Sequence, residues 1–292
     1  MQPRFTLILV SFLVLACSPP PHPTLTLIDV GYGVAVLLND GGTALLMDGG
    51  YAEESDELER QLHRAGIESL AVLIASHGHD DHLDGLIVLL ENGWPVGTVA
   101  GNVEVHDERF KDRFWHILTE RAIPYTRLRA GDDVMFGTVR CEVLHPDTLT
   151  RDRNESSMAA RFHLGNRTVL IPSDITRPIQ RHLAETTPSR LTGDIVVLPH
   201  HGDLVDPLFL DTVAPRYALL SVGPNPWNLP AQKTIRELLR RNIRLLDTRT
   251  LGTITVSLEP DRISVIDSTG PGDAKRRESD MDDRLRRWAG EP

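Results

Sequence analysis

Apolar residues near the start of the chain recur with the spacing of strands and then of a helix. The runs Thr24 to Asp29, Val34 to Asn39 and Thr43 to Met47 alternate, contain β-branched residues and are separated by glycine-containing turns. This pattern predicts β-strands joined as hairpins. The charged, amphipathic stretch Glu53 to Ala65 predicts a helix, and the short apolar run Leu70 to Ala75 predicts a buried strand.

Further along the chain, strand-like runs begin to alternate with helical ones. The predicted helices are Asp81 to Leu90, Pro207 to Val213 and Lys233 to Arg241. The predicted strands are Val139 to Leu144, Met158 to Leu164, Thr168 to Ile171, Ile195 to Leu198, Ala218 to Val222 and Ile254 to Leu258. Hairpins followed by strand–helix alternation indicate an α/β fold with two mixed sheets flanked by helices.

The N-terminal segment predicts export. Residues 1–17 read as a signal peptide, with an apolar run from Phe5 to Ala16 that is too short to span a membrane. The ending Val14-Leu15-Ala16-Cys17 resembles the bacterial lipobox, so Cys17 is the predicted site of lipidation. A plain secretory signal is the alternative, and it would also export the protein. Ser18 after a lipidated cysteine favours an outer-membrane anchor, facing the periplasm or the cell surface.

The remaining organisation follows from composition. Residues 18–23 form a proline-rich spacer, residues 24–268 a single folded domain, and residues 269–292 a charged tail that we predict to be disordered. A chain of 292 residues with 40% hydrophobic residues can bury one large core. The sequence indicates no oligomeric state.

Net charge and cysteine content limit the possible substrates and metal ligands. The net charge of −10 predicts no extensive basic surface for nucleic acid, so a phosphate-bearing substrate would have to be held locally. The second cysteine, Cys141, lies in an apolar strand and reads as a buried thiol. Metal ligation must therefore fall on histidine, aspartate and asparagine.

Metal-binding residue types follow four of the strand-like runs directly. They are Asp48, the segment His77-Gly78-His79-Asp80-Asp81-His82, Asp174, and the pair His200-His201. Polar residues at the carboxyl ends of neighbouring strands converge, and we expect them on one rim of a sheet. The alternatives are a polar surface loop for the histidine segment and turn residues for Asp174 and the later pair.

The spacing within the histidine segment suits two ions. His77 and His79 are two residues apart in an extended segment, so both side chains can reach one ion. Asp81 and His82 fall on the first helical turn and can reach a second ion, and Asp174 can bridge the two. Two divalent ions with a hydroxide between them activate a nucleophile at neutral pH. Imidazole and carboxylate ligands suit zinc or manganese, with zinc favoured.

These motifs resemble a known family. His-x-His-x-Asp-His at positions 77–82 is the signature of the metallo-β-lactamase superfamily, with Asp48 and Asp174 at matching strand ends. The chain is more closely similar to the soluble hydrolase domain of ComEC-type competence proteins, which work in DNA uptake. The similarity is carried in order by Asp29 to Gly33, Asn154 to Ser157, Ile171 to Asp174, Leu198 to Gly202 and Leu251 to Ile254. It implies an αββα four-layer sandwich and phosphodiester hydrolysis.

The chain departs from that family at several positions. ComEC-type domains usually have Gln and Asp where this chain has Tyr32 and Val34, and Ser where it has Asp203. Their late histidine before a proline, a ligand of the second ion, corresponds here to Leu229. The second ion would then be held weakly, or His200 or His201 would substitute.

The superfamily's third histidine ligand is also not evident. His145 and Asn154 lie near its expected place and are further candidates for the metal site.

The favoured hypothesis is an exported, lipid-anchored, metal-dependent hydrolase acting on phosphodiesters or nucleic acid. Asp81, His200 and His201 are its catalytic candidates, the histidines as ligand or as proton donor to the leaving group. Within the enzyme class, a lactonase or β-lactamase activity is the alternative. Outside it, the alternative is a metal-binding envelope or DNA-uptake component without turnover.

Overall fold

The computed structural model describes residues 22–103 and 108–266. The predicted signal peptide, Cys17, all but the last two residues of the spacer, and the tail at 269–292 lie outside the described residues. None of the helices within the described ranges has the length and apolarity needed to cross a membrane.

The described strands form two mixed sheets. The first has the order β15-β14-β1-β2-β3-β4-β5-β6, with β3 to β6 parallel and the other pairings antiparallel. Its strands are β1 (Thr24–Leu27), β2 (Val36–Asp40), β3 (Thr43–Met47), β4 (Leu70–Ala75), β5 (Val96–Gly101), β6 (Tyr125–Arg127), β14 (Ile254–Leu258) and β15 (Ile263–Ile266).

The second sheet has the order β13-β12-β11-β10-β9-β8-β7. Strands β10 to β13 are parallel, and β7 to β10 pair antiparallel. Its strands are β7 (Asp133–Phe136), β8 (Val139–His145), β9 (Ala159–Leu164), β10 (Arg167–Ile171), β11 (Ile195–Val197), β12 (Tyr217–Leu220) and β13 (Arg244–Asp247).

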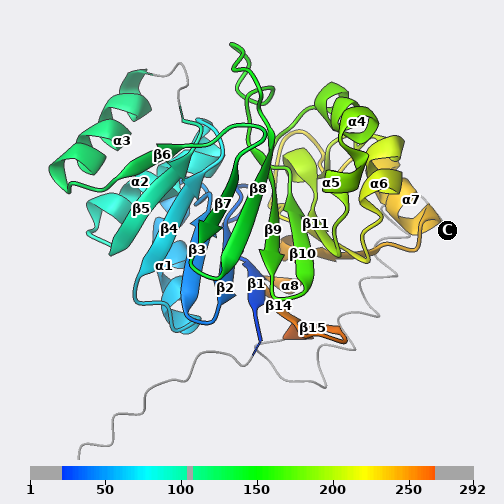
Figure 1. Ribbon diagram of the computed structural model, residues 1–292, viewed down its shortest axis with the longest axis horizontal. Helices are drawn as coiled ribbons and strands as arrows, with labels where there is room; N and C mark the ends of the chain where they lie inside the picture. The colour runs from blue at the N-terminus through cyan, green and yellow to red at the C-terminus, as the bar shows by residue number, and fades with distance from the viewer. Residues whose placement is uncertain (1–21, 104–107, 267–292) are drawn as a thin grey trace, which may run out of the picture.

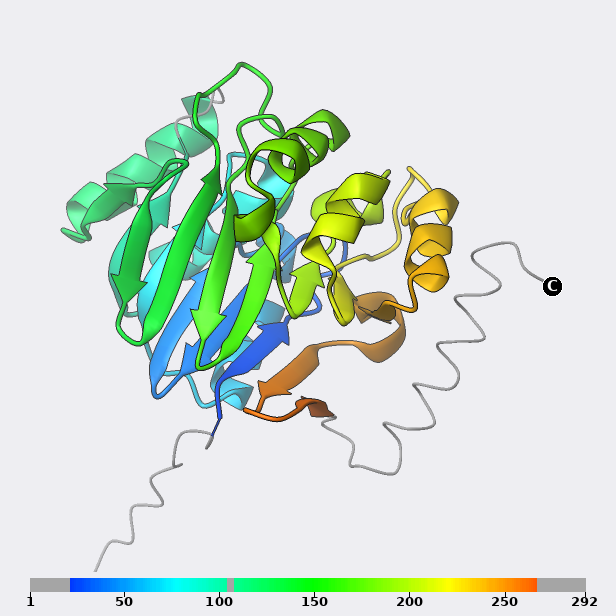
Figure 2. The same cartoon turned by 45° about the vertical axis from the view of Figure 1, so that its right-hand side comes forward.

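Helices cover both outer faces. Figure 1 shows α1, α2 and α3 on one flank of the molecule and α4 to α7 on the other. The helices are α1 (Ser55–Arg64), α2 (Asp80–Glu91), α3 (Glu108–Glu120), α4 (Arg177–Thr186), α5 (Pro188–Leu191), α6 (Pro207–Val213), α7 (Gln232–Arg240) and α8 (Thr248–Leu251), with short 3-10 turns at Ala52–Glu54 and Pro199–Gly202. Figure 2 shows the two sheets packed one behind the other between these layers.

Successive side chains of a strand point to opposite faces of its sheet, so they divide between two cores. Leu45 and Val72 of the first sheet point toward the second sheet and join the large central core. Their neighbours Leu46 and Leu73 point outward and pack with α1 and α2 in a second core. The predicted αββα four-layer sandwich is therefore confirmed.

The sequence pattern did not predict every element. Helices α3 and α4 and the strands β5, β6, β7, β13 and β15 were not predicted. The apolar stripe of α4 is thin, because Leu183 and Ala184 are its buried apolar residues. Strands β1 and β2 are also shorter than predicted, whereas β3 has the predicted bounds. Residues 28–35 form a loop that carries Tyr32 beside the site described next.

Candidate metal centre

The predicted ligands meet where the two sheets face each other, and not on one rim of a single sheet. Asp48 follows β3 and His77 follows β4, which are parallel neighbours in the first sheet. Asp174 follows β10 and His200 follows β11, which are parallel neighbours in the second. The expected convergence at strand ends is present, but it is divided between two sheets.

The histidine segment has the local backbone that its spacing implies. His79 is extended and precedes α2, whose first turn carries Asp81 and His82. His77 Nε2 and His79 Nδ1 lie 2.9 Å apart, so both nitrogens address the same point. Gly85 seats α2 against the loop after β3, because a Cβ there would lie 2.0 Å from the carbonyl oxygen of Gly49.

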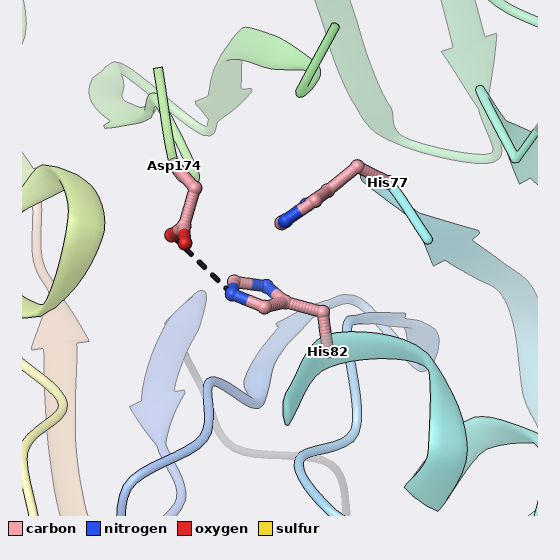
Figure 3. A group of neighbouring side chains, drawn as sticks. All are labelled: His77, His82 and Asp174. Carbon is pink, nitrogen blue, oxygen red and sulfur yellow. Dashed lines mark ion pairs between the residues drawn. The ribbon is translucent and has the colours of Figure 1, made fainter. Parts of the chain in front are cut away.

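Three candidate ligands surround one position. Ligand atoms of His77, His82 and Asp174 all lie within 4.8 Å of one another, and Figure 3 shows the three side chains directed toward a common point. His82 Nε2 lies 3.3 Å from Asp174 Oδ1. Each of the three side chains is buried.

A second group overlaps the first through His82. Ligand atoms of Asp81, His82 and His201 also lie within 4.8 Å of one another. His201 Nε2 is 3.0 Å from Asp81 Oδ2 and 3.9 Å from Asp174 Oδ2. The two oxygens of Asp174 thus face different groups, which places this carboxylate between two candidate ion positions.

Buried polar atoms without hydrogen bonds show that this donor set fits divalent ions. Among the described residues, His82 Nε2, Asp174 Oδ1 and Asn154 Oδ1 are buried and make no hydrogen bond. Such atoms are costly unless something coordinates them. Imidazole nitrogens with carboxylate oxygens are the ligands of zinc and manganese sites.

Asp48 contacts His82 at the ring nitrogen that faces away from the candidate ion. Its Oδ2 lies 2.8 Å from His82 Nδ1, and it accepts hydrogen bonds from the backbone N–H and hydroxyl of Ser76 at 2.9 and 2.7 Å. A carboxylate on the far nitrogen of a histidine fixes the ring and directs the other nitrogen to the ion. The structure therefore places Asp48 behind His82, where the sequence had made it a candidate ligand.

Electrostatics prepare the first group for an ion. Burial lowers the pKa of His77 well below its usual value, and it also lowers the pKa of His79. Both rings are therefore neutral at pH 7, as metal ligation requires. Burial opposes ionisation of Asp174, but the adjacent His82 holds the pKa of that carboxyl well below its usual range.

The second group is charged. Burial disfavours the imidazolium of His82, yet Asp174, Asp81 and Asp48 together raise its pKa well above the usual value. Burial likewise opposes ionisation of Asp81, but His82 and His201 lower its pKa to about 2. Bound cations would take over the charge balance that the proton on His82 otherwise supplies.

Left-handed backbone turns the second-sheet residues toward the centre. Ser173, His200 and His201 have φ values of 49°, 49° and 51°. Such conformations cost non-glycine residues about 1–3 kcal/mol each and gather at functional sites. His201 donates from Nδ1 toward the carbonyl of Ser221 at 3.3 Å, which leaves Nε2 for Asp81 or an ion.

His200 takes a different position from His201. Its side chain is 32% exposed, and its Nε2 lies 3.3 Å from Asn154 Nδ2 and 3.9 Å from Asp174 Oδ2. His200 therefore stands at the mouth of the centre, and Asn154 lies beside it with its amide oxygen unpaired.

The other candidates face away. His145 Nε2 lies 2.7 Å from the carbonyl of Glu155, so that nitrogen is occupied by backbone. Leu229 packs on the central core, and the following Pro230 presses on the His201–Gly202 turn. His201, and not residue 229, reaches Asp81.

Cys141 is buried in the central core, where burial raises the pKa of its thiol to about 12.

Comparison with known proteins agrees with this geometry. Residues 28–223 match the family described as the metallo-beta-lactamase superfamily. The chain is 26% identical over 272 residues to Recombination protein 2 of Haemophilus influenzae, covering 89% of this chain and 32% of that protein. It is 26% identical over 249 residues to Competence protein ComA of Neisseria gonorrhoeae, covering 82% and 33% respectively. The chain thus spans about a third of the length of these relatives.

Solved structures show the same fold. CmlA, a diiron beta-hydroxylase from Streptomyces venezuelae, superposes with a TM-score of 0.53 at 16% identity, covering 82% of this chain and 55% of CmlA. The metallo-beta-lactamase fold protein YhfI from Bacillus subtilis gives 0.51 at 16% identity, covering 77% and 96%.

Proposed function

The chain belongs to the metallo-beta-lactamase superfamily of metallohydrolases, and from that premise we propose that it is an exported phosphodiesterase that works with two divalent ions. The observation that carries the proposal is the pair of overlapping ligand groups, His77-His82-Asp174 and Asp81-His82-His201. Divalent ions held in such a pair supply Lewis acidity and lower the pKa of water. Zinc is the favoured metal for this donor set.

The residues of the chain have separate tasks in this proposal. His77 and His79 would hold one ion, Asp81 and His201 the other, and His82 and Asp174 lie between them. His200 would donate a proton to the leaving oxygen, because it is half-exposed at the mouth of the centre and 3.9 Å from Asp174.

Local positive charge supports a phosphate-bearing substrate on an otherwise acidic protein. Arg153 donates a hydrogen bond to the carbonyl of Gly78, inside the histidine segment. A cavity of about 260 Å³ is lined by Arg127, Arg129, Asn102 and Asp147, among other residues, and Asn102 connects it to the segment of Arg153 by a hydrogen bond to the carbonyl of Ser156. Relatives named for recombination and competence favour nucleic acid among the phosphodiesters.

Export and lipidation rest on the sequence of residues 1–17. We propose that Cys17 is lipidated and anchors the enzyme to the outer membrane. Labelling with a radioactive fatty acid should mark the wild-type chain, while Cys17→Ser should stay unlabelled and be released from membranes.

Metal analysis combined with turnover tests the function. The purified protein should contain close to two ions per chain and hydrolyse bis(p-nitrophenyl) phosphate and oligonucleotides. His79→Ala should lose an ion and turnover, while His116→Ala, an exposed histidine on α3, should retain both. One tightly held ion without turnover on any phosphodiester would contradict the proposal and favour a binding role. If the protein hydrolysed only lactones or lactams, phosphodiesters would be the wrong substrate class.

A further inference from the structure

An aromatic row leads away from the metal centre. The ring of Tyr32 lies 4.2 Å from that of His201, centroid to centroid, with an angle of 30° between the planes. On its other side Tyr32 lies 4.9 Å from Trp227 at an angle of 34°. The three rings therefore stack roughly in series, from a candidate ligand outward to the surface.

Trp227 at the end of the row is unusually exposed. The residue is 60% exposed, although tryptophan is the largest hydrophobic residue. The loop that presents it is firmly held, because Asn225 Oδ1 accepts hydrogen bonds from the backbone N–H groups of Trp227 and Leu229 at 3.2 and 2.9 Å. The side-chain amide of Asn225 donates to the carbonyls of Gly223 and Leu229. The backbone that carries Trp227 is thus held in place before any ligand arrives, and its ring packs on Tyr32.

The same loop is fixed to the metal centre. A Cβ on Gly223 would lie 2.5 Å from the carbonyl carbon of Gly31 and 2.8 Å from the nitrogen of Tyr32, so the two loops are in direct backbone contact. Ser221, whose carbonyl faces His201, donates its hydroxyl to Gly33 at 2.6 Å. An occupant of the aromatic row would therefore have a fixed position relative to the ions.

Arg153 and the aromatic row lie beside different ligand groups of the centre. Arg153 contacts the backbone of Gly78, beside His79, whereas Tyr32 contacts His201. On the side of Arg153, Asn102 donates a hydrogen bond to the carbonyl of Ser156 and lines a cavity that is also lined by Arg127, Arg129 and Asp147. Charge for phosphates on one side and flat apolar faces on the other are the two components of sites for single-stranded nucleic acid.

We propose that Tyr32 and Trp227 form a subsite that receives an unpaired nucleobase next to the scissile phosphodiester, so that the substrate is single-stranded nucleic acid. This inference rests on the proposed phosphodiesterase function. A base within a duplex already stacks on its neighbours and cannot present its face to Trp227, whereas an unpaired base can. Tyr32 stands where ComEC-type domains usually have Gln, so the row is a feature of this chain.

Binding by the full-length protein tests the subsite without turnover. With chelator present, a single-stranded thymidine oligonucleotide should quench tryptophan fluorescence. Trp227→Phe should abolish that quenching, and Trp94→Phe, which replaces a buried tryptophan on the far side of the first sheet, should retain it. Trp227→Ala should weaken binding roughly tenfold, the value of about one base–aromatic stack. Circular dichroism would verify that all three variants fold.

An abasic oligonucleotide of the same length supplies the matched ligand. Its affinity should be equal for the wild type and Trp227→Ala, because it has no base to stack. Equal losses on both oligonucleotides, or quenching that persists in Trp227→Phe, would overturn the subsite. Base-dependent binding without hydrolysis by the metal-loaded protein would instead uphold the subsite and refute the phosphodiesterase function.

Discussion

The two sheets contribute to the metal centre in different ways. The first supplies His77, His79, Asp81 and His82 from one continuous segment with the ordinary backbone of a strand end and a first helical turn. The second supplies its residues from two separate loops in which Ser173, His200 and His201 are left-handed. Regular secondary structure places the first set, whereas strained turns that the surrounding contacts must enforce place the second.

Asp174→Asn should have the largest effect, because its two oxygens are the link between the contributions of the sheets. The amide retains the shape but loses the charge that both ligand groups share, so turnover should fall to the level of the metal-free protein. Metal content by mass spectrometry and hydrolysis of bis(p-nitrophenyl) phosphate measure it. Asp133→Asn, which replaces an exposed aspartate of β7 that pairs with Arg140 and belongs to neither ligand group, is the matched control. Retention of two ions and turnover in Asp174→Asn would show that the link is not needed.

His200→Gln tests whether the two left-handed histidines, His200 and His201, have different roles. Removing a general acid lowers kcat by about 10²–10⁴-fold, and the ion content should stay unchanged because His200 lies outside both ligand groups. His201→Gln should instead lose one ion. On a substrate whose leaving group is good enough to depart without a proton, His200→Gln should regain much of the wild-type activity. Loss of an ion in His200→Gln would assign it as a ligand.

Asp48→Asn tests whether the regular backbone of the first-sheet set is enough to orient His82, or whether the set also needs Asp48, a first-sheet residue that is itself left-handed with φ 61°. Loss of such an outer partner typically costs about 10–100-fold in metal affinity or activity. Titration with a chelator should show weaker binding, since Asn holds the His82 ring less firmly. Asp40→Asn at the turn end of the β2–β3 hairpin should leave the affinity unaltered. A wild-type affinity in Asp48→Asn would mean that α2 alone orients His82.

Proton release on metal binding is the smallest expected effect and distinguishes histidines within the first-sheet set. Because the pKa of His82 is raised well above 6.5, this ring is protonated at pH 7 in the metal-free protein and must lose its proton to bind an ion. The lowered pKa of His77 means that it releases none. Calorimetry in buffers of different ionisation enthalpy should detect about one proton per chain from His82, and affinity should fall as the pH is lowered. His82→Asn should remove this buffer dependence.

The linked stability has the same sign. In the metal-free protein, the raised pKa of His82 stabilises the fold fully below pH 6.5, and this contribution is lost as the pH rises through the folded value.

Sequence reasoning recovered the parts of the site that follow from regular structure. The directions of four side chains follow from their spacing alone, because strand and helix periods fix where each side chain points. These residues are His77, His79, Asp81 and His82. The location of Asp174 followed from the end of an apolar strand. The sandwich fold followed from hairpins that give way to strand–helix alternation.

What could not be predicted depends on contacts between distant segments. Nothing in the pair His200-His201 indicates which ring turns inward, since left-handed backbone at non-glycine residues is imposed by tertiary structure. The role of Asp48 depends on its distance from His82, which lies 34 positions later. The contact between His201 and Asp81 likewise joins residues that are 120 positions apart.

The position of the ligands between the sheets has a consequence for the lifetime of the protein. Ions bound by His77 and Asp81 on one side and Asp174 and His201 on the other would cross-link the two halves of the sandwich, and their binding energy would add to the free energy of folding. A chain that receives no metal would open more often along this junction and be degraded sooner by proteases. The supply of metal would then set how much of the protein persists, as well as how fast each molecule turns over.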